Sequence, residues 1–258
     1  MINKELKIWL NENIERGCSK SDLINTLIQN NIDKKKALIL YYKYYNYNKI
    51  FYKNLDNIFL KLKGGYKLDD NRVNMYIINN FINNETCDKL IKIIRNNNQP
   101  SRVTSGDSKK FRTSKTCHMN EKDIVVKYVN NKICELVGID NRRSELIQGQ
   151  YYSIDNEFKA HNDYFNTSNY EEWNTYMRQL GQRTLTCMIY LNNVEKGGET
   201  EFPRLNIKLK PQKGTLIIWN NLHKNGSVNE DTLHAGLPII SGEKFIITKW
   251  FRTRGTIE

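Results

Sequence analysis

The residues with the clearest capacity for chemistry are a few histidines and one nearby aspartate. The chain has 4 histidines in 258 residues, and one of them begins the sequence His161-Asn162-Asp163. On an extended segment, residues two apart point to the same side, so an imidazole and a carboxylate would converge on one point. Such a pair supplies two ligands for a transition metal. The pattern by itself also arises by chance, so a third ligand has to come from elsewhere in the chain.

Two other histidines are candidates for that third ligand. His234 stands beside the turn signal of Gly236 and ahead of a strongly strand-like tail, whereas His223 lies in a polar stretch with the character of a loop tip. This context favours His234, with His223 as the alternative. His118 is expected to be an ordinary surface residue. Two histidines and one carboxylate, with open coordination positions, suit non-haem Fe(II) better than structural zinc.

A lysine near the end of the chain offers a positive charge to an anionic cosubstrate. Strict alternation over residues 244–252 puts five side chains on one strand face, namely Lys244, Ile246, Thr248, Trp250 and Arg252. A lysine that points into a strand-built interior is costly unless it meets an anion. The alternative is an edge-strand lysine that faces solvent.

The elements that would position these residues change in character along the chain. Apolar residues recur at helical spacing in the first fifty residues, and strand and helix patterns alternate from residue 76 to 136, around a polar loop at 99–117. Beyond residue 144 the chain is strand-like, with glycine and proline at the turns. We therefore expect an α+β chain that ends in a sandwich or jelly roll. The expected division is a helical segment at 1–50, a linker at 51–74 and a main domain at 75–258 that holds the candidate site residues, with its core at about 145–254.

Composition and charge exclude several classes of protein. No apolar run approaches the ~20 residues of a membrane span, and the first residues lack the apolar region of a secretory signal, so a cytoplasmic location is expected. Five scattered cysteines without a C-x-x-C pair argue against a disulfide framework or a zinc–thiolate site. The net charge of +12 invites a nucleic-acid partner, but residues 151–258 contribute only +1 of it. Nucleic acid is therefore not the expected partner.

The motifs together resemble the prolyl 4-hydroxylase family of 2-oxoglutarate- and Fe(II)-dependent dioxygenases. The resemblance covers about residues 75–254, and its upstream part includes Arg112-Thr113-Ser114. Its other motifs are His161-x-Asp163, the run from Gly181 to Asn192, Gly197-Gly198-Glu199-Thr200-Glu201-Phe202-Pro203, Pro211-x-x-Gly214, Trp219, His234-Ala235-Gly236-x-Pro238, Gly242-Glu243-Lys244 and Lys249-Trp250.

The resemblance implies a double-stranded β-helix fold and a set of site residues. His161, Asp163 and His234 would be the iron ligands, and Lys244 would bind the distal carboxylate of 2-oxoglutarate. Further cosubstrate contacts would come from Tyr152, from Tyr190 and from Thr186, which shares strand parity with Tyr190. Candidate substrate contacts are Trp250 and Arg183. Because Arg183 is out of phase with Tyr190, its role needs a bend or a strand end.

The activity that the resemblance implies is hydroxylation of peptidyl proline at the 4-position, in proline-rich or collagen-like chains. The reaction is coupled to oxidative decarboxylation of 2-oxoglutarate to succinate and CO2, with Fe(II), O2 and L-ascorbate as cofactors. The partner is then a proline-containing peptide or protein. Alternatives are the same chemistry on peptidyl lysine or on a nucleic-acid base, and a non-catalytic jelly-roll binding module.

Three departures from the family pattern bear on the substrate. Phe158 stands where the family usually has tyrosine, three residues before the first iron-ligand histidine. Asn156-Glu157 replaces the usual Gly-Gln, and Arg252 replaces a frequent histidine two residues beyond Trp250. These changes leave the iron chemistry intact and affect the prolyl specificity.

Overall fold

The computed structural model describes residues 4–15, 18–42, 65–101, 111–166, 173–177, 180–223 and 226–254. Parts of the expected linker and of the polar loop at 99–117 lie outside these residues. The longer helices are α1 (Lys4–Glu15), α2 (Lys20–Gln29), α4 (Asn84–Asn97) and α6 (Ile124–Val137), and residues 34–42 are also helical. Short helical turns occur at Asn141–Arg143, Trp173–Met177, Pro203–Leu205 and Glu230–Thr232.

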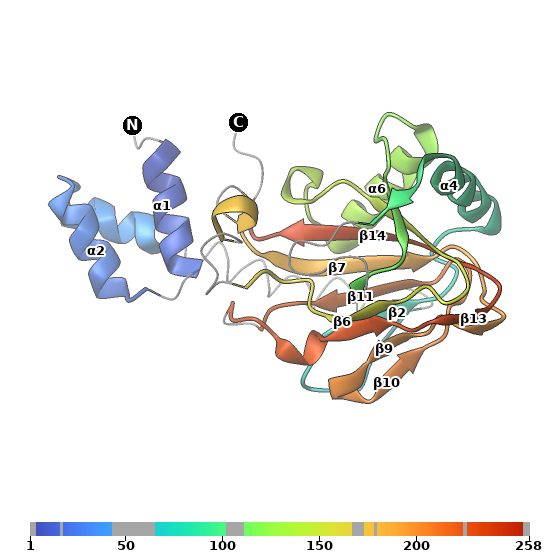
Figure 1. Cartoon of the computed structure of the whole chain (residues 1–258). Coiled ribbons are helices and arrows are strands. Elements are labelled where there is room, and N and C mark those ends of the chain that lie inside the picture. The colour runs from blue at the N-terminus through green and yellow to red at the C-terminus, as the bar shows by residue number, and fades with distance from the viewer. Residues whose placement is uncertain are drawn as a thin grey trace.

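A large antiparallel sheet forms the centre of the molecule (Figure 1). Its eight strands lie in the order β1 (Gly65–Lys67), β2 (Met75–Ile78), β11 (Leu216–Asn220), β7 (Arg183–Tyr190), β14 (Lys244–Arg252), β5 (Gln148–Tyr152), β4 (Lys115–His118) and β3 (Gln99–Pro100). Residues 65–67 of the expected linker thus already pair with β2, and part of the expected 99–117 loop forms β3 and β4. These short strands carry too few apolar residues to be recognised from periodicity.

A smaller sheet lies opposite one face of the large one. It contains β10 (Ile207–Leu209), β9 (Thr200–Phe202), β12 (His234–Gly236) and β6 (Phe158–His161), and a separate pair is formed by β13 (Ile239–Ser241) and β8 (Lys196–Gly197). The two facing sheets make the expected jelly roll, with α4 and α6 on the other face of the large sheet (Figure 1). The α+β prediction is confirmed.

Side chains of β7 point alternately to the two faces of the large sheet and pack in a different core cluster on each face. Leu185, Cys187 and Ile189 pack toward α4 and α6, in the core cluster that also holds Leu90 and Ile133. Residues of the other parity belong to the space between the sheets, where Met188 and Tyr190 join a second core cluster. Because both faces are covered, β7 and β14 are buried almost throughout, and a sequence pattern of simple apolar–polar alternation is absent from them.

The N-terminal helices form a third, separate apolar cluster. Leu10 of α1 packs with Leu23 and Leu27 of α2 and with Ala37 and Leu40 of the third helix. Ser19 begins α2 as its N-cap and accepts a hydrogen bond from the backbone of Asp22. The expected helical segment is therefore present as far as residue 42, and in Figure 1 α1 and α2 lie beside the sheets.

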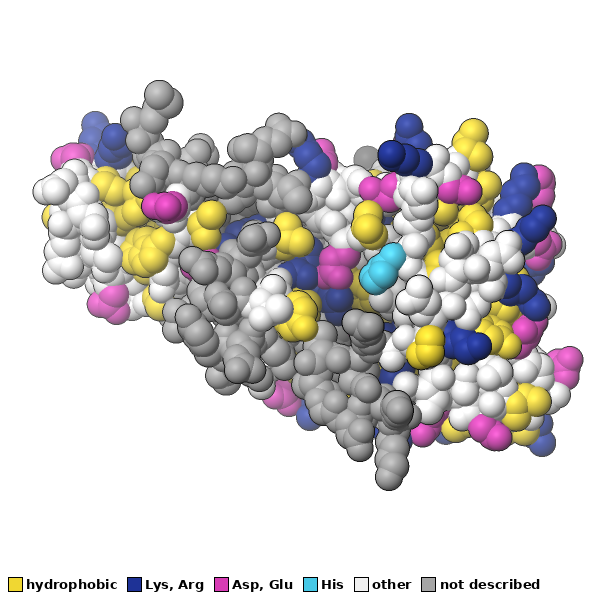
Figure 2. All heavy atoms as spheres, turned by 45° about the horizontal axis from the view of Figure 1, so that its top comes forward, with side chains coloured by type: hydrophobic (Ala, Val, Ile, Leu, Met, Phe, Trp, Pro, Cys, Tyr) yellow, Lys and Arg dark blue, Asp and Glu magenta, His cyan; other side chains and the backbone are white. Residues whose placement is uncertain are grey.

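The outer surface carries mixed charge. On the face shown in Figure 2, the described Lys and Arg side chains are interspersed with Asp and Glu and do not form one continuous patch. Within the described residues, no helix has both the length and the apolar character needed to cross a bilayer.

Candidate metal centre and cosubstrate pocket

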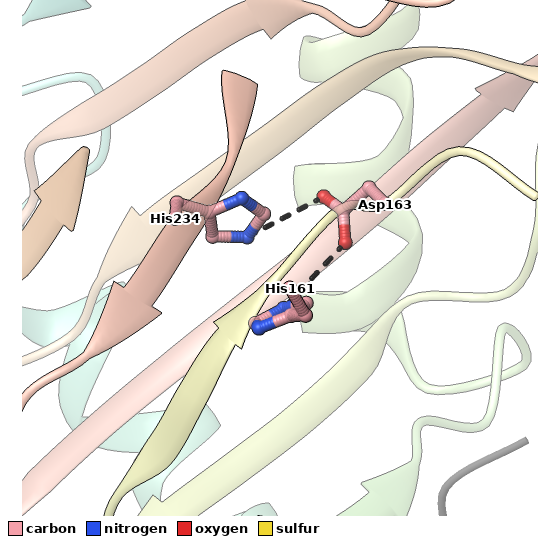
Figure 3. Close-up of side chains that lie close together, drawn as sticks. All are labelled: His161, Asp163 and His234. Atoms are coloured by element: carbon pink, nitrogen blue, oxygen red, sulfur yellow. Dashed lines mark ion pairs between the residues drawn. The ribbon is translucent and has the colours of Figure 1, made fainter. Parts of the chain in front are cut away.

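Three side chains from two neighbouring strands converge on one point between the sheets (Figure 3). His161 ends β6, Asp163 follows two residues later, and His234 begins β12, directly opposite His161 in the strand register. One ligand atom of each residue lies within 4.8 Å of the others. The Nε2 atoms of His161 and His234 are 3.9 and 3.8 Å from the carboxylate oxygens of Asp163.

The orientation of both imidazoles suits metal binding. The Nδ1 of His161 donates to the carbonyl of Lys159 at 2.8 Å, and the Nδ1 of His234 donates to the carbonyl of Thr232 at 2.9 Å. A carbonyl accepts only, so each ring carries its proton on Nδ1 and keeps the Nε2 lone pair for the centre. Burial, with His234 beside it, holds the pKa of His161 below its usual range, so the ring is neutral.

The carboxylate of Asp163 is fixed by a chain of hydrogen bonds. Thr186 Oγ1 donates to Asp163 Oδ2 at 2.7 Å, and Asn221 Nδ2 donates to Thr186 Oγ1 at 2.9 Å. Burial alone would raise the pKa of Asp163, but the neighbouring imidazoles, Arg183 and the Thr186 hydrogen bond outweigh it and keep the pKa low. Two imidazoles with free Nε2 atoms and one oriented carboxylate on one side of a centre are the donor set that Fe(II) takes in oxygenases.

A pocket extends from this centre between the two sheets. Its lining includes the three candidate ligands, and β14 contributes four residues of one parity, so the alternation expected for β14 holds up to residue 250. The lining residues are Arg112, Gln150, Tyr152, Phe158, His161, Asp163, Met188, Thr200, Trp219, His234, Gly236, Lys244, Ile246, Thr248 and Trp250.

Lys244 points into this pocket and is 2% exposed. Its Nζ donates to the carbonyl of Gly198 at 2.7 Å and lies 5.3 and 5.5 Å from the ring centroids of Tyr152 and Tyr190. Burial lowers the pKa of Lys244 to about 7, although Glu199 opposes the shift. No carboxylate forms an ion pair with Lys244 among the described residues, so the ammonium group fits a carboxylate supplied by a bound 2-oxoglutarate.

The two tyrosines and the threonine that were expected to contact the cosubstrate have different places. Tyr152 lines the pocket and donates to Gln150 Oε1 at 2.7 Å. The hydroxyl of Tyr190 donates to Thr200 Oγ1 at 2.7 Å, and Thr200 is the one of the two that lines the pocket. Thr186 points toward Asp163, so its contact in the structure is to a candidate metal ligand.

Of the two candidate substrate contacts, Trp250 lines the pocket, and Arg183 lies against the Trp250 ring without being a lining residue. The Arg183 guanidinium is 4.1 Å from the ring centroid of Trp250. Arg183 forms a two-point ion pair with Glu145, at 2.6 and 2.7 Å, and Arg252 donates to the same carboxylate at 2.6 Å. Arg183 begins β7 and pairs across a register shift at the end of β14, which is the strand-end position that its sequence parity required.

The other two histidines lie outside this centre. His118 is in β4 and exposed, and His223 is an exposed loop residue whose backbone N–H donates to the carbonyl of Ser227. Of the two sequence candidates, the structure brings His234, and not His223, beside His161 and Asp163. Sequence reasoning did not single out Glu145, Gln150 or Asn221, because a lone polar residue in a strand or turn carries no spacing signal.

Comparison with known proteins agrees with this geometry. The 2OG-Fe(II) oxygenase superfamily matches residues 147–252. A protein of Acanthamoeba polyphaga mimivirus that carries the name prolyl 4-hydroxylase is 32% identical over 188 residues, which are 72% of this chain and 77% of the relative. The chain belongs to the prolyl 4-hydroxylase family. It is a 2-oxoglutarate- and Fe(II)-dependent oxygenase by that membership, and its donor set fits the metal.

Other members of the prolyl 4-hydroxylase family show the same relationship. The crystal structure of a viral collagen prolyl hydroxylase from Paramecium Bursaria Chlorella virus-1, in complex with 2OG, is 28% identical and has a TM-score of 0.54, covering 69% of this chain and 95% of that one. The rat prolyl 4-hydroxylase subunit alpha-3 is 30% identical, over 69% of this chain, and the match spans 34% of the rat protein.

Proposed function

We propose that this chain hydroxylates peptidyl proline at the 4-position, in proline-rich or collagen-like segments, with O2 as oxidant and L-ascorbate as reductant. The observation that carries the proposal is the convergence of His161, Asp163 and His234 in the same pocket as a buried lysine that lacks a carboxylate partner among the described residues. The prolyl hydroxylase names of the relatives supply the substrate class.

The residues of the chain divide the work of binding and orientation. His161, Asp163 and His234 would hold Fe(II), which when bound supplies the oxidation of 2-oxoglutarate to succinate and CO2 coupled to hydroxylation of a C–H bond. Lys244 would bind the distal carboxylate of 2-oxoglutarate. Thr186 and Asn221 keep Asp163 in position, as partners behind metal ligands do. Trp219, Met188 and Ile246 give the pocket apolar walls that limit water.

The substrate is proposed to bind at the side of the pocket where Trp250 and Arg183 lie. The Nε1 of Trp250 is buried and has no hydrogen-bond acceptor among the described residues. A buried donor without an acceptor costs free energy, which a peptide carbonyl would recover. The ring also gives a flat apolar surface of the kind on which proline packs.

The test is mass spectrometry of a panel of proline-containing peptides incubated with the protein, Fe(II), 2-oxoglutarate and ascorbate. We expect a mass gain of one oxygen on proline, in step with release of succinate. His161→Ala is the matched control, because it removes one ligand and leaves the substrate side intact. The proposal fails if the wild type modifies none of the peptides, or if it releases no more succinate than the variant.

A further inference from the structure

Besides Lys244, β14 carries another buried lysine, on the face of the large sheet that is turned away from the pocket. Lys249 is fully buried, and it has the strand parity of Ile247 and Phe251, which pack toward α4 and α6. No carboxylate forms an ion pair with Lys249 among the described residues. Burial lowers the pKa of Lys249 from its ordinary value, because a low-dielectric environment disfavours the charged form. The proposed iron and cosubstrate chemistry does not use this costly charge.

The Nζ of Lys249 donates to two neutral acceptors in the segment that precedes β5. One is Asn141 Oδ1 at 2.9 Å, and the other is the backbone carbonyl of Glu145 at 3.1 Å. The backbone N–H of Glu145 in turn donates to the carbonyl of Trp250 at 2.9 Å. Two consecutive residues of β14 therefore hold the peptide groups on both sides of the Glu145 Cα. Because each peptide group is planar, this fixes the direction in which the Glu145 side chain leaves the backbone.

The side chain of Glu145 connects this backbone contact to the pocket. Its carboxylate accepts from Arg183 Nε and Nη2 at 2.6 and 2.7 Å. The Arg183 guanidinium lies 4.1 Å from the ring centroid of Trp250, and its Nη1 donates to the carbonyl of Asp163 at 3.4 Å. Trp250 lines the pocket. A path of direct contacts thus runs from Lys249 through Glu145 and Arg183 to the wall at which the substrate is proposed to bind.

Of the two contacts of Lys249, the one to Glu145 has no substitute. Ser144 Oγ also donates to Asn141 Oδ1, at 3.0 Å, so Asn141 keeps a donor without the lysine. No other donor meets the Glu145 carbonyl among the described residues. An apolar side chain of the same length would fill the space of Lys249 and leave that carbonyl unpaired, which costs free energy and releases the backbone.

We propose that Lys249 is a positioning residue for the peptide substrate. By holding the Glu145 carbonyl from the far face of the sheet, it sets Arg183 against Trp250, and its loss weakens peptide binding while the binding of iron and 2-oxoglutarate is retained. This inference rests on the proposed prolyl hydroxylation, because it takes the Trp250 side of the pocket as the peptide site.

The principal test is Lys249→Met, which keeps the length of the side chain and removes its donors. We expect the KM for a proline-containing peptide to rise roughly tenfold, as for the loss of a charge-assisted hydrogen bond, while kcat changes little. The affinity of Mn(II)-loaded protein for 2-oxoglutarate should equal that of the wild type. A merely structural role would instead lower the active fraction, and so reduce kcat and leave KM unchanged.

Two further variants support this test. Asn141→Ala is the matched control, because it removes the other acceptor of Lys249 and leaves the contact to Glu145, so the peptide KM should stay at the wild-type value. Lys249→Gln replaces the Met variant if that variant does not fold. Its amide supplies a neutral donor to the buried site but is one bond shorter than the lysine, and KM should rise in the same direction.

A double-mutant cycle shows whether the effect passes through the arginine. In Arg183→Gln, Glu145 keeps its ion pair with Arg252, but the guanidinium against Trp250 is gone. Lys249→Met should then raise the peptide KM by no more than about twofold further, since both changes remove the same support. Effects that multiply fully would show that Lys249 does not act through Arg183.

Peptide binding without turnover separates this inference from the proposed function. Fluorescence anisotropy of a labelled proline-containing peptide, with protein loaded with Mn(II) and 2-oxoglutarate, should show the same roughly tenfold weakening in Lys249→Met. An unchanged peptide Kd and KM in the folded variant, or an equal loss of 2-oxoglutarate affinity, would overturn the inference and leave the proposed function standing. If the wild type binds peptides but hydroxylates none, the proposed function fails, and the peptide Kd still decides the role of Lys249. A wild type that neither binds nor modifies any peptide would overturn both.

Discussion

At the scale of single residues, neighbouring groups set the orientation or the pKa of each functional side chain of the site. His161 and His234 keep their Nε2 atoms available because the Nδ1–H of each ring donates a hydrogen bond to a backbone carbonyl. Asp163 keeps its orientation since Thr186 donates to it. Burial lowers the pKa of the Lys244 ammonium group to about 7. For Thr186 and Lys244, these surroundings predict effects on metal binding and on 2-oxoglutarate binding.

Thr186→Val should weaken metal binding, because the valine keeps the shape of the threonine and loses the hydrogen bond to Asp163. Removal of such a partner typically costs about 10- to 100-fold in metal affinity. Titration of Fe(II) or Mn(II) by calorimetry measures it. Thr184→Val is the matched control, since Thr184 is equally buried on the same strand but bonds Asn220. Equal affinities for the two variants would show that Thr186 does not support the centre.

The affinity for 2-oxoglutarate should depend on pH through Lys244. The ammonium form binds the carboxylate, and a depressed pKa means that this form is lost as pH rises through about 7. The affinity of Mn(II)-loaded protein for 2-oxoglutarate should therefore fall above this pH, by up to about tenfold per unit. Fluorescence titration measures it. Lys244→Arg does not titrate in this range, so its affinity should stay flat with pH, and a wild-type curve equally flat would contradict the role.

At the scale of elements, one carboxylate holds together the segments that carry the substrate side. Glu145 precedes β5, Arg183 begins β7 and Arg252 ends β14. The two arginines place their guanidinium groups over Phe165 as well, both at 4.8 Å from its ring centroid. This cluster lies where the pairing of β14 with β7 shifts register. At this end of the two strands, side-chain ion pairs therefore hold the segments together in place of regular backbone hydrogen bonds.

Glu145→Gln should destabilise the protein strongly, because two largely buried guanidinium groups lose their shared anion. Breaking a buried pair from one side costs several kcal/mol, and with the Glu145 side chain 23% exposed we expect about 2–4 kcal/mol in the free energy of unfolding. Urea denaturation measures it. Glu85→Gln, which breaks an exposed pair with Lys89, should have no detectable effect.

The contribution of Glu145 should also vanish in acid. Its folded-state pKa lies below the usual 4.5, so the stabilisation is fully present above about 4.5 and is lost as pH falls through the lower folded-state value. The difference between wild type and Glu145→Gln should therefore shrink on acidification. A difference that grows toward low pH would show that the ion pairs are not its source.

At the scale of the whole molecule, three apolar clusters divide the chain. One joins α4 and α6 to the large sheet, one fills the space between the sheets, and one belongs to the N-terminal helices alone. The first two share strands, so they should respond together. The third shares no residue with them, and an ion pair at 3.8 Å connects Glu12 of α1 to Arg254, which lies two residues after β14.

Leu27→Ala should therefore affect the N-terminal helices only. Leu27 is fully buried in their cluster, and a cavity of this kind costs about 2–5 kcal/mol. Hydrogen exchange read by mass spectrometry should speed up over residues 4–42, while β7 and β14 keep their protection and turnover of 2-oxoglutarate is unchanged. Ile218→Ala, in the shared core, should instead speed exchange throughout the sheet. Exchange that rises equally everywhere in Leu27→Ala would show one cooperative unit.

The sequence alone determined the chemistry of the site to a large extent. His161-x-Asp163 required only the two-residue period of an extended chain. The same period left Lys244 either inside the sheet or facing solvent, and the family resemblance favoured the inward position that the structure has. Those are local rules, so local sequence carries them. The choice of His234 over His223 was favoured by sequence context and by the family resemblance, and became a geometric fact only when β12 paired with β6.

Only the tertiary structure decided which groups meet across long separations. Thr186 meets Asp163 over 23 residues, and Arg183 meets Glu145 over 38. The place of Arg112 in the pocket lining, with Ser114 and Gln148 as its hydrogen-bond partners, also became visible only in the structure. Such contacts depend on strand order and register, which many residues set jointly through burial, and so no local spacing in the chain encodes them.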